Sequence, residues 1–79
     1  MDPKIIETRI LQAMPDARVS VVSDDQVHFT ARIISDEFAG KNRIQRHRAV
    51  HSAIGPELGR EIHALSLDLK TAAEVAEIP

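Results

Sequence analysis

The sequence predicts a small α/β fold of element order α-β-β-α-α-β-α, with a three-stranded mixed sheet and helices on one face. Two stretches of alternating apolar residues flank a polar turn, which is typical of an antiparallel hairpin. A helical stretch then crosses over to a third strand, which favours a mixed sheet. The chain has 79 residues, which fits one domain spanning residues 1–79.

The first helix is expected to start at Pro3, with Asp2 as its cap, and to stop before Pro15. Its apolar residues recur at helical spacing, which indicates one buried face. They are Ile6, Ile10, Ala13 and Met14, widened by Ile5 and Leu11.

The hairpin is predicted from "ARVSVVS", the turn "DDQ" and the stretch that starts at Val27. The second strand alternates strictly, so one set of side chains should face the core and the other should face outward. The inward set is Val27, Phe29, Ala31 and Ile33, and the outward set is His28, Thr30, Arg32 and Ile34.

The second half begins with a short helical turn at "DEFAG", which Gly40 can end. A longer helix is expected from about Asn42 to about Ala53. Its predicted inward residues are Ile44, Val50, Ile54 and Leu58, with His47 and His51 on the same side. The strand "IHALSLDL" places His63 on the face of Leu65, Leu67 and Leu69, and leaves Ser66 and Asp68 outward. A short helix capped by Thr71 follows.

Composition excludes several classes of protein. The chain has no cysteine, so it cannot form disulfides, a thiolate-only metal cage or a cysteine nucleophile. Its net charge of −2 argues against non-specific nucleic-acid binding, which usually needs a basic excess. No apolar run approaches the roughly 20 residues of a membrane span. The charged, amphipathic start "MDPKIIETRI" is unlike a signal peptide, so we expect a cytoplasmic protein that does not bind membranes.

A basic cluster, "GKNRIQRHR", starts the long helix and could grip phosphates or dock an acidic partner. Its candidate binding residues are Lys41, Arg43, Arg46, His47 and Arg48. The element order resembles the KH fold of RNA-binding proteins, but the GxxG loop of that fold is absent here. The two phenylalanines are few for base stacking. A nucleic-acid-binding transcriptional regulator therefore remains the alternative function.

The histidines offer two candidate metal sites. His47 and His51 have the one-turn spacing of metalloprotease helices, but Arg48 replaces the catalytic glutamate, so they are better explained as core-edge residues that hydrogen-bond locally. His63 occupies a position where an aliphatic side chain would pack better. It is either a metal ligand or a core-edge residue whose ring is hydrogen-bonded. Whether the hairpin turn comes near it depends on the strand order.

Three stretches together resemble the BolA family: "VHFTARIISDEF", "SDEFAGKNRIQRHRAVHSAI" and "ELGREIHALSLDLKT". The family pattern has a small residue and phenylalanine before Gly-Lys, then Arg-His-Arg, then His-Ala-Leu-Ser. The matching residues are Phe38, Gly40, Lys41, Arg46, His47, Arg48, His63, Ala64, Leu65 and Ser66. The C-terminal "TAAEVAEIP" departs from the family by lacking its usual Pro and Trp.

This resemblance implies a KH-like fold without the GxxG loop, and a non-enzymatic role in iron–sulfur cluster assembly, trafficking or iron regulation. A [2Fe–2S] cluster would be shared in a heterodimer with a monothiol glutaredoxin, with glutathione supplying a further thiolate. His63 would be one ligand, and the hairpin loop would supply another. This loop lacks the cysteine or extended-loop histidine of many members, so His28 is the nearest candidate, with Asp24 and Asp25 as alternatives. The free protein could also form a homodimer.

Overall fold

The computed structural model describes residues 2–56 and 64–76. Within these residues there are seven elements, in the predicted order. They are α1 (Pro3–Ala13), β1 (Arg18–Val22), β2 (His28–Ile34), the 3₁₀ turn η1 (Asp36–Phe38), α2 (Arg43–Ile54), β3 (Ala64–Lys70) and α4 (Ala72–Ala76). None of the helices within the described residues is long and apolar enough to cross a membrane.

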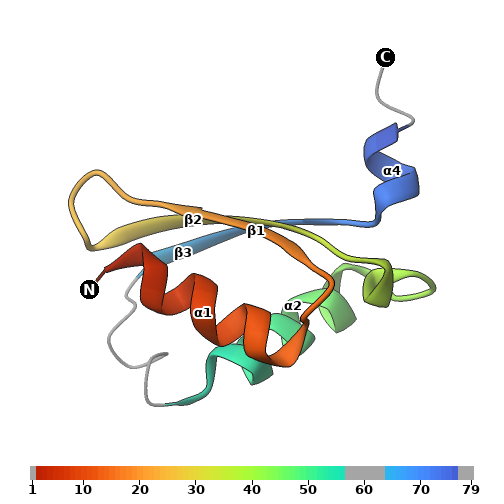
Figure 1. Ribbon diagram of the computed structural model, residues 1–79, viewed down its shortest axis with the longest axis horizontal. Coiled ribbons are helices and arrows are strands. Elements are labelled where there is room, and N and C mark those ends of the chain that lie inside the picture. Colours follow the sequence, from red (N-terminus) through yellow and green to blue (C-terminus); the bar gives the residue numbers. More distant parts are fainter. Residues whose placement is uncertain (1, 57–63, 77–79) are drawn as a thin grey trace.

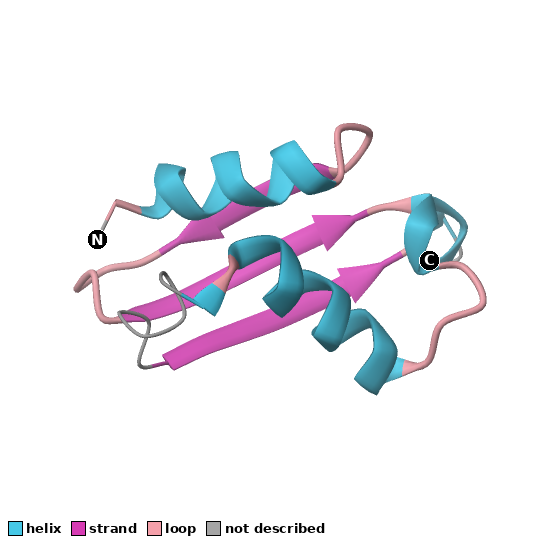
Figure 2. Ribbon diagram, turned by 90° about the horizontal axis from the view of Figure 1, so that it is seen from below, coloured by secondary structure: helices cyan, strands magenta, loops and turns pink. Residues whose placement is uncertain are grey.

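The sheet has the order β1-β2-β3, so the middle strand is the second arm of the hairpin. β1 and β2 are antiparallel, with Val22 opposite Thr30. β2 and β3 are parallel, with His28 opposite Ala64. The predicted mixed sheet is thereby confirmed. Both long helices, α1 and α2, lie on the same side of the sheet (Figures 1 and 2).

The core lies between that helical layer and the sheet. Fully buried residues come from both layers, because α1, β2 and α2 each turn an apolar face inward. They include Ile6 and Ile10 of α1, Phe29, Ala31 and Ile33 of β2, Phe38, and Val50 and Ile54 of α2. Leu65, Leu67 and Leu69 of β3 pack against this core and are partly buried. Each fully buried aliphatic or aromatic side chain contributes about 1.5–3 kcal/mol through removal from water.

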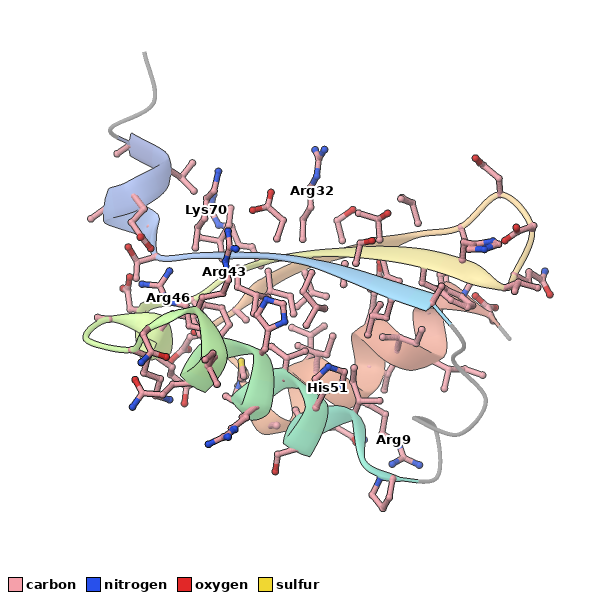
Figure 3. All side chains as sticks on the ribbon, turned by 180° about the vertical axis from the view of Figure 1, so that it is seen from behind. Arg9, Arg32, Arg43, Arg46, His51 and Lys70 are labelled. Atoms are coloured by element: carbon pink, nitrogen blue, oxygen red, sulfur yellow. The ribbon has the colours of Figure 1, made fainter. Side chains whose placement is uncertain are left out.

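The opposite face of the sheet is polar, as predicted. Thr30, Arg32, Ser66 and Asp68 are exposed there, and Figure 3 shows Arg32 on the side of the sheet opposite α1 and α2.

The predicted face of α2 was wrong in two places. Val50 and Ile54, one turn apart, are buried, but Ile44 is 63% exposed and His51 is exposed. At 3.6 residues per turn, Ile44 lies well off the line through Val50 and Ile54. Arg46 and His47 are half-buried on the inner side instead. Leu58, the remaining predicted inward residue, lies outside the described residues.

Outside this helix, three apolar residues predicted to face inward are also exposed. Val27 stands before the first paired residue of β2 and is 43% exposed, and Ile5 and Leu11 of α1 are similarly exposed. Each lies at the margin of its apolar face, so the stripes are narrower than predicted.

One outward N–H at the free edge of β1 is occupied by a side chain from α1. The Val21 N–H points away from β2 and donates to Oε1 of Glu7 over 2.9 Å. A carboxylate at this position satisfies an edge donor that would otherwise be open to another strand.

Candidate metal site and basic groove

The hairpin turn is organised around the Asp25 carboxylate. Its Oδ1 accepts the backbone N–H groups of Val27 (2.9 Å) and His28 (2.8 Å). Gln26 has φ of 60°, in the left-handed region, and its N–H donates to Ser23 Oγ over 2.8 Å. These local hydrogen bonds fix the backbone of the turn and therefore the position of His28, the first residue of β2.

Asp25 also orients the His28 ring. Asp25 Oδ2 lies 2.7 Å from His28 Nδ1, and the imidazole side chain is 73% exposed. The pKa of the Asp25 carboxyl is held well below its ordinary value of 3.8, first by the His28 backbone N–H, then by the His28 ring. In a neutral imidazole, a hydrogen bond to the ionised Asp25 favours the tautomer that keeps its proton on Nδ1 and its lone pair on Nε2. This carboxylate–histidine arrangement is the one that accompanies metal-ligating imidazoles.

The strand register brings this turn to the end of the sheet where β3 begins. His28 is directly opposite Ala64, the first residue of β3. His63 precedes Ala64 in the sequence and lies outside the described residues. A shallow hollow of about 190 Å³ surrounds the turn. It is lined by Val22, Ser23, Asp24, Asp25, His28 and Thr30.

Within residues 2–56 and 64–76, no three His, Asp or Glu side chains gather closely enough to hold a metal ion. Of the hairpin candidates, His28 has an available ring nitrogen, whereas both oxygens of Asp25 already accept hydrogen bonds. Asp25 is thus better suited to orienting a ligand than to being one. The predicted outward face of His28 is confirmed, since the ring is exposed while its neighbour Phe29 is 2% exposed. Asp24 is exposed at the rim of the hollow.

The same turn is poorly arranged for nucleophilic catalysis. The Ser23 hydroxyl donates to Asp25 Oδ1 over 3.4 Å, and the His28 ring binds the other oxygen of the same carboxylate. A serine nucleophile needs a base that accepts its proton directly, usually a histidine. Here both groups bind one carboxylate, so Ser23 is not activated by His28.

The predicted basic cluster forms one wall of a groove beside β3. This basic groove has a volume of about 410 Å³. It is lined by Lys41, Arg43, Arg46 and His47 from the start of α2, by Leu67, Asp68, Leu69 and Lys70 of β3, and by Glu74 of α4. Arg48, the remaining residue of the predicted cluster, is exposed and does not line it.

The start of α2 is held in place by a capping box. Asn42 Oδ1 accepts the Gln45 N–H, and Gln45 Oε1 accepts the Asn42 N–H, both over 2.9 Å. Gly40, with φ of 77°, supplies the left-handed turn that leads into it. Such reciprocal bonding satisfies helix-end donors and fixes the direction of the first turn, so Lys41 and Arg43 are presented on a defined backbone.

The Arg46 guanidinium hydrogen-bonds to other groups of the protein itself. Its Nε donates to the Lys41 carbonyl (2.9 Å), and its Nη1 donates to the Leu69 carbonyl (3.2 Å) and to Glu74 Oε1 (2.8 Å). The guanidinium carbon also lies 5.9 Å from the centre of the Phe38 ring. Arg46 therefore joins α2, β3 and α4, a role that its place in a basic run did not predict.

Glu74 was missed by the sequence analysis, although a short pattern indicates it. Thr71 and Glu74 form the spacing of a capping box, and Glu74 Oε1 accepts the Thr71 N–H over 2.8 Å. This N–H, and next Arg46, lower the pKa of the Glu74 carboxyl from its ordinary value of 4.5. A search for T-x-x-E before a short helix would have found this residue.

Fold and surface features together define the class: a small α/β protein of KH-like element order that lacks a GxxG loop. Within that class, the chain belongs to the BolA-like protein family, whose model matches residues 4–74.

Known relatives agree with this placement. A bolA protein homologue from Coxiella burnetii is 32% identical, with a TM-score of 0.83 over 98% of this chain and 99% of that one. The BolA domain of SufE1 from Arabidopsis thaliana is 34% identical, with a TM-score of 0.73 over 91% and 93% of the two chains. BolA-like protein 1 of Mus musculus is 33% identical over 100% of this chain. The chain spans about half of that curated relative, 55% of its length.

Proposed function

We propose that this protein is a non-enzymatic partner of a monothiol glutaredoxin, with which it shares a [2Fe–2S] cluster in iron–sulfur assembly, trafficking or iron regulation. Family membership supports the class of partner. The observation that carries the proposal is the Asp25–His28 pair, which lies at the end of the sheet where β3 begins. The first residue of β3, Ala64, directly follows His63 in the sequence.

The donor set suits a shared cluster and does not suit a resident one. Iron–sulfur clusters are normally held by thiolates, and this chain has no cysteine. Imidazole nitrogens can replace two thiolates on one iron, as they do in Rieske centres. Nitrogen ligands from this chain and thiolates from the glutaredoxin and glutathione would together complete the set.

Each residue has a distinct part in this proposal. His28 is opposite Ala64, the residue that directly follows His63 in the sequence. His63 and His28 would each donate a ring lone pair, and Asp25 would fix the His28 ring by holding Nδ1. A protonated imidazole has no lone pair to donate, so acidification should release the cluster.

The test is reconstitution with a monothiol glutaredoxin and glutathione, followed by visible absorption and circular dichroism. His63→Ala should leave the heterodimer intact but remove the mixed nitrogen–sulfur signature and shorten the lifetime of the cluster. His28→Ala should cause a milder change of the same kind. Asp25→Asn should resemble His28→Ala, because it weakens the hold on the ring.

His51→Ala is the matched control, because this exposed imidazole stands on α2, far from the hairpin turn (Figure 3). It should leave the spectrum unchanged. If His28→Ala has no effect while Asp24→Ala or Asp25→Ala does, the second ligand is a carboxylate. A normal spectrum from a destabilised His63→Ala variant would make His63 a core residue and overturn the proposal.

A further inference from the structure

The two edges of the sheet are treated differently. The outer edge of β1 is only five residues long, and Glu7 occupies the Val21 N–H. The outer edge of β3 is seven residues long. An uncovered strand of that length presents a row of backbone donors and acceptors that can pair with another chain.

The hydrogen bonds at the end of β3 identify which groups point outward. The Lys70 carbonyl accepts the Ser35 N–H, on the side of β2, while the Leu69 carbonyl faces the other way and accepts from Arg46. Backbone groups alternate sides along a strand. The N–H and C=O groups of Leu65 and Leu67 therefore point away from β2, as those of Leu69 do, while the three side chains pack against the core. Within the described ranges, no hydrogen bond reaches the N–H or C=O of Leu65 or Leu67.

The basic groove lies against this outer edge of β3. Its lining holds four cationic side chains, Lys41, Arg43, Arg46 and Lys70, against two acidic ones, Asp68 and Glu74. Figure 3 shows Arg43, Arg46 and Lys70 gathered beside the end of β3 that leads into α4. Since Arg46 is paired with Glu74, and Lys70 Nζ lies 3.9 Å from Asp68 Oδ1, the charge left for a ligand comes mainly from Lys41 and Arg43.

We propose that the free edge of β3 binds an extended, acidic peptide segment of a partner protein as a fourth strand. Its backbone would pair with the outward N–H and C=O groups of Leu65 and Leu67, and its acidic side chains would face Lys41 and Arg43. Backbone pairing supplies affinity and side-chain pockets supply specificity in this mode of recognition. This proposal goes beyond the proposed function, because its charged contacts lie in the groove beside the second half of β3, whereas the hairpin turn lies at the start of that strand.

Charge and shape select this occupant over two others. A second copy of the chain paired through the same edge would offer the strand ALSLDLK, whose single acidic residue supplies little negative charge for Lys41 and Arg43. A single-stranded nucleic acid would leave the outward ladder groups unmatched, and no Phe, Tyr or Trp side chain lines the groove for base stacking.

The probe is a fluorescent peptide of alternating Val and Glu, as long as β3. Arg43→Glu should weaken its binding about fivefold, the scale of one reversed surface charge pair. Arg48→Glu is the matched control, since it makes the same charge change on the same helix outside the groove, and it should weaken binding less than twofold. Arg43 is the first residue of α2, where an acidic side chain is favoured by the helix dipole, so the variant should fold.

Amide exchange measured by NMR separates strand pairing from charge attraction alone. On adding the peptide, the Leu65 and Leu67 amides should become protected, while those of Ser66 and Asp68 already pair with β2 and should change little. Equal binding by a peptide N-methylated at every residue would overturn the proposal. So would absent peptide binding beside tight binding of oligo-dT, or peptide-independent dimerisation through the β3 edge.

Discussion

Replacing Arg46 with alanine should destabilise the fold far more than replacing any other arginine of α2. The change removes two hydrogen bonds to backbone carbonyls, those of Lys41 at 2.9 Å and Leu69 at 3.2 Å. Each contributes about 1 kcal/mol net, and the contact with Phe38 contributes about 0.5–1 kcal/mol. Without counting the exposed Glu74 partner, we expect a loss of about 2–3 kcal/mol of unfolding free energy, or about 10–20 °C in Tm for a chain of this size.

Urea unfolding followed by circular dichroism measures this loss as a lower midpoint at unchanged slope. Arg48→Ala is the control, because that exposed side chain makes no hydrogen bond to a described residue; it should cost no more than about 0.5 kcal/mol. Arg46→Lys should fall between the two, since an ammonium keeps the charge but not the planar fork. If Arg46→Ala costs no more than Arg48→Ala, the contacts of Arg46 do not hold α2, β3 and α4 together and the reasoning fails.

Three further predictions follow from the same structure. Ile54→Ala should lower the free energy of unfolding by about 2–5 kcal/mol in urea, whereas Ile44→Ala should lower it by no more than about 0.5 kcal/mol. Equal losses would mean that Ile44 faces the core, as the sequence predicted. The pKa of Glu74 lies below 4.5, so its contacts stabilise the fold above pH 4.5 and are lost as the pH falls through the folded-state pKa. The Tm of Glu74→Gln should thus lie below that of wild type at neutral pH, and the gap should close in acid. Glu7→Ala should cost about 1 kcal/mol and speed exchange of the Val21 amide measured by NMR, and an unchanged rate would contradict the edge-closing role.

The sheet was predictable because its signal is local and strict. Phe29, Ala31 and Ile33 alternate with polar residues, and a period of two has only one arrangement with the apolar set inside. The face of α2 was harder, because Arg46 and His47 occupy inner positions and interrupt the apolar stripe. A long arginine can line a core edge with its stem while its head bonds at the surface. Ile44 was therefore placed inward for its apolar character, although its spacing from Val50 and Ile54 does not favour that side.

In the candidate sites, too, residues with a local sequence signal were predicted and contacts between distant residues were not. The turn residues Asp25 and His28 were identified as candidates from the sequence, but their pairing depends on the backbone at Gln26, with its φ of 60°. The role of Arg46 depends on partners that are distant in sequence, Glu74 at 28 residues and Leu69 at 23. Local patterns carry no information on such contacts until the parallel strand is in place.

The register of the parallel pair has a consequence for how the chain folds. Residue 28 pairs with residue 64 and residue 34 with residue 70, so every contact of this pair closes a long loop through η1 and α2. The hairpin of β1 and β2 closes only a short one. Loop-closure entropy opposes the long-range pairing, so we expect the hairpin to form first and β3 to dock late. Until it docks, the middle strand exposes its own edge, and the chain is then most open to pairing with its neighbours in solution.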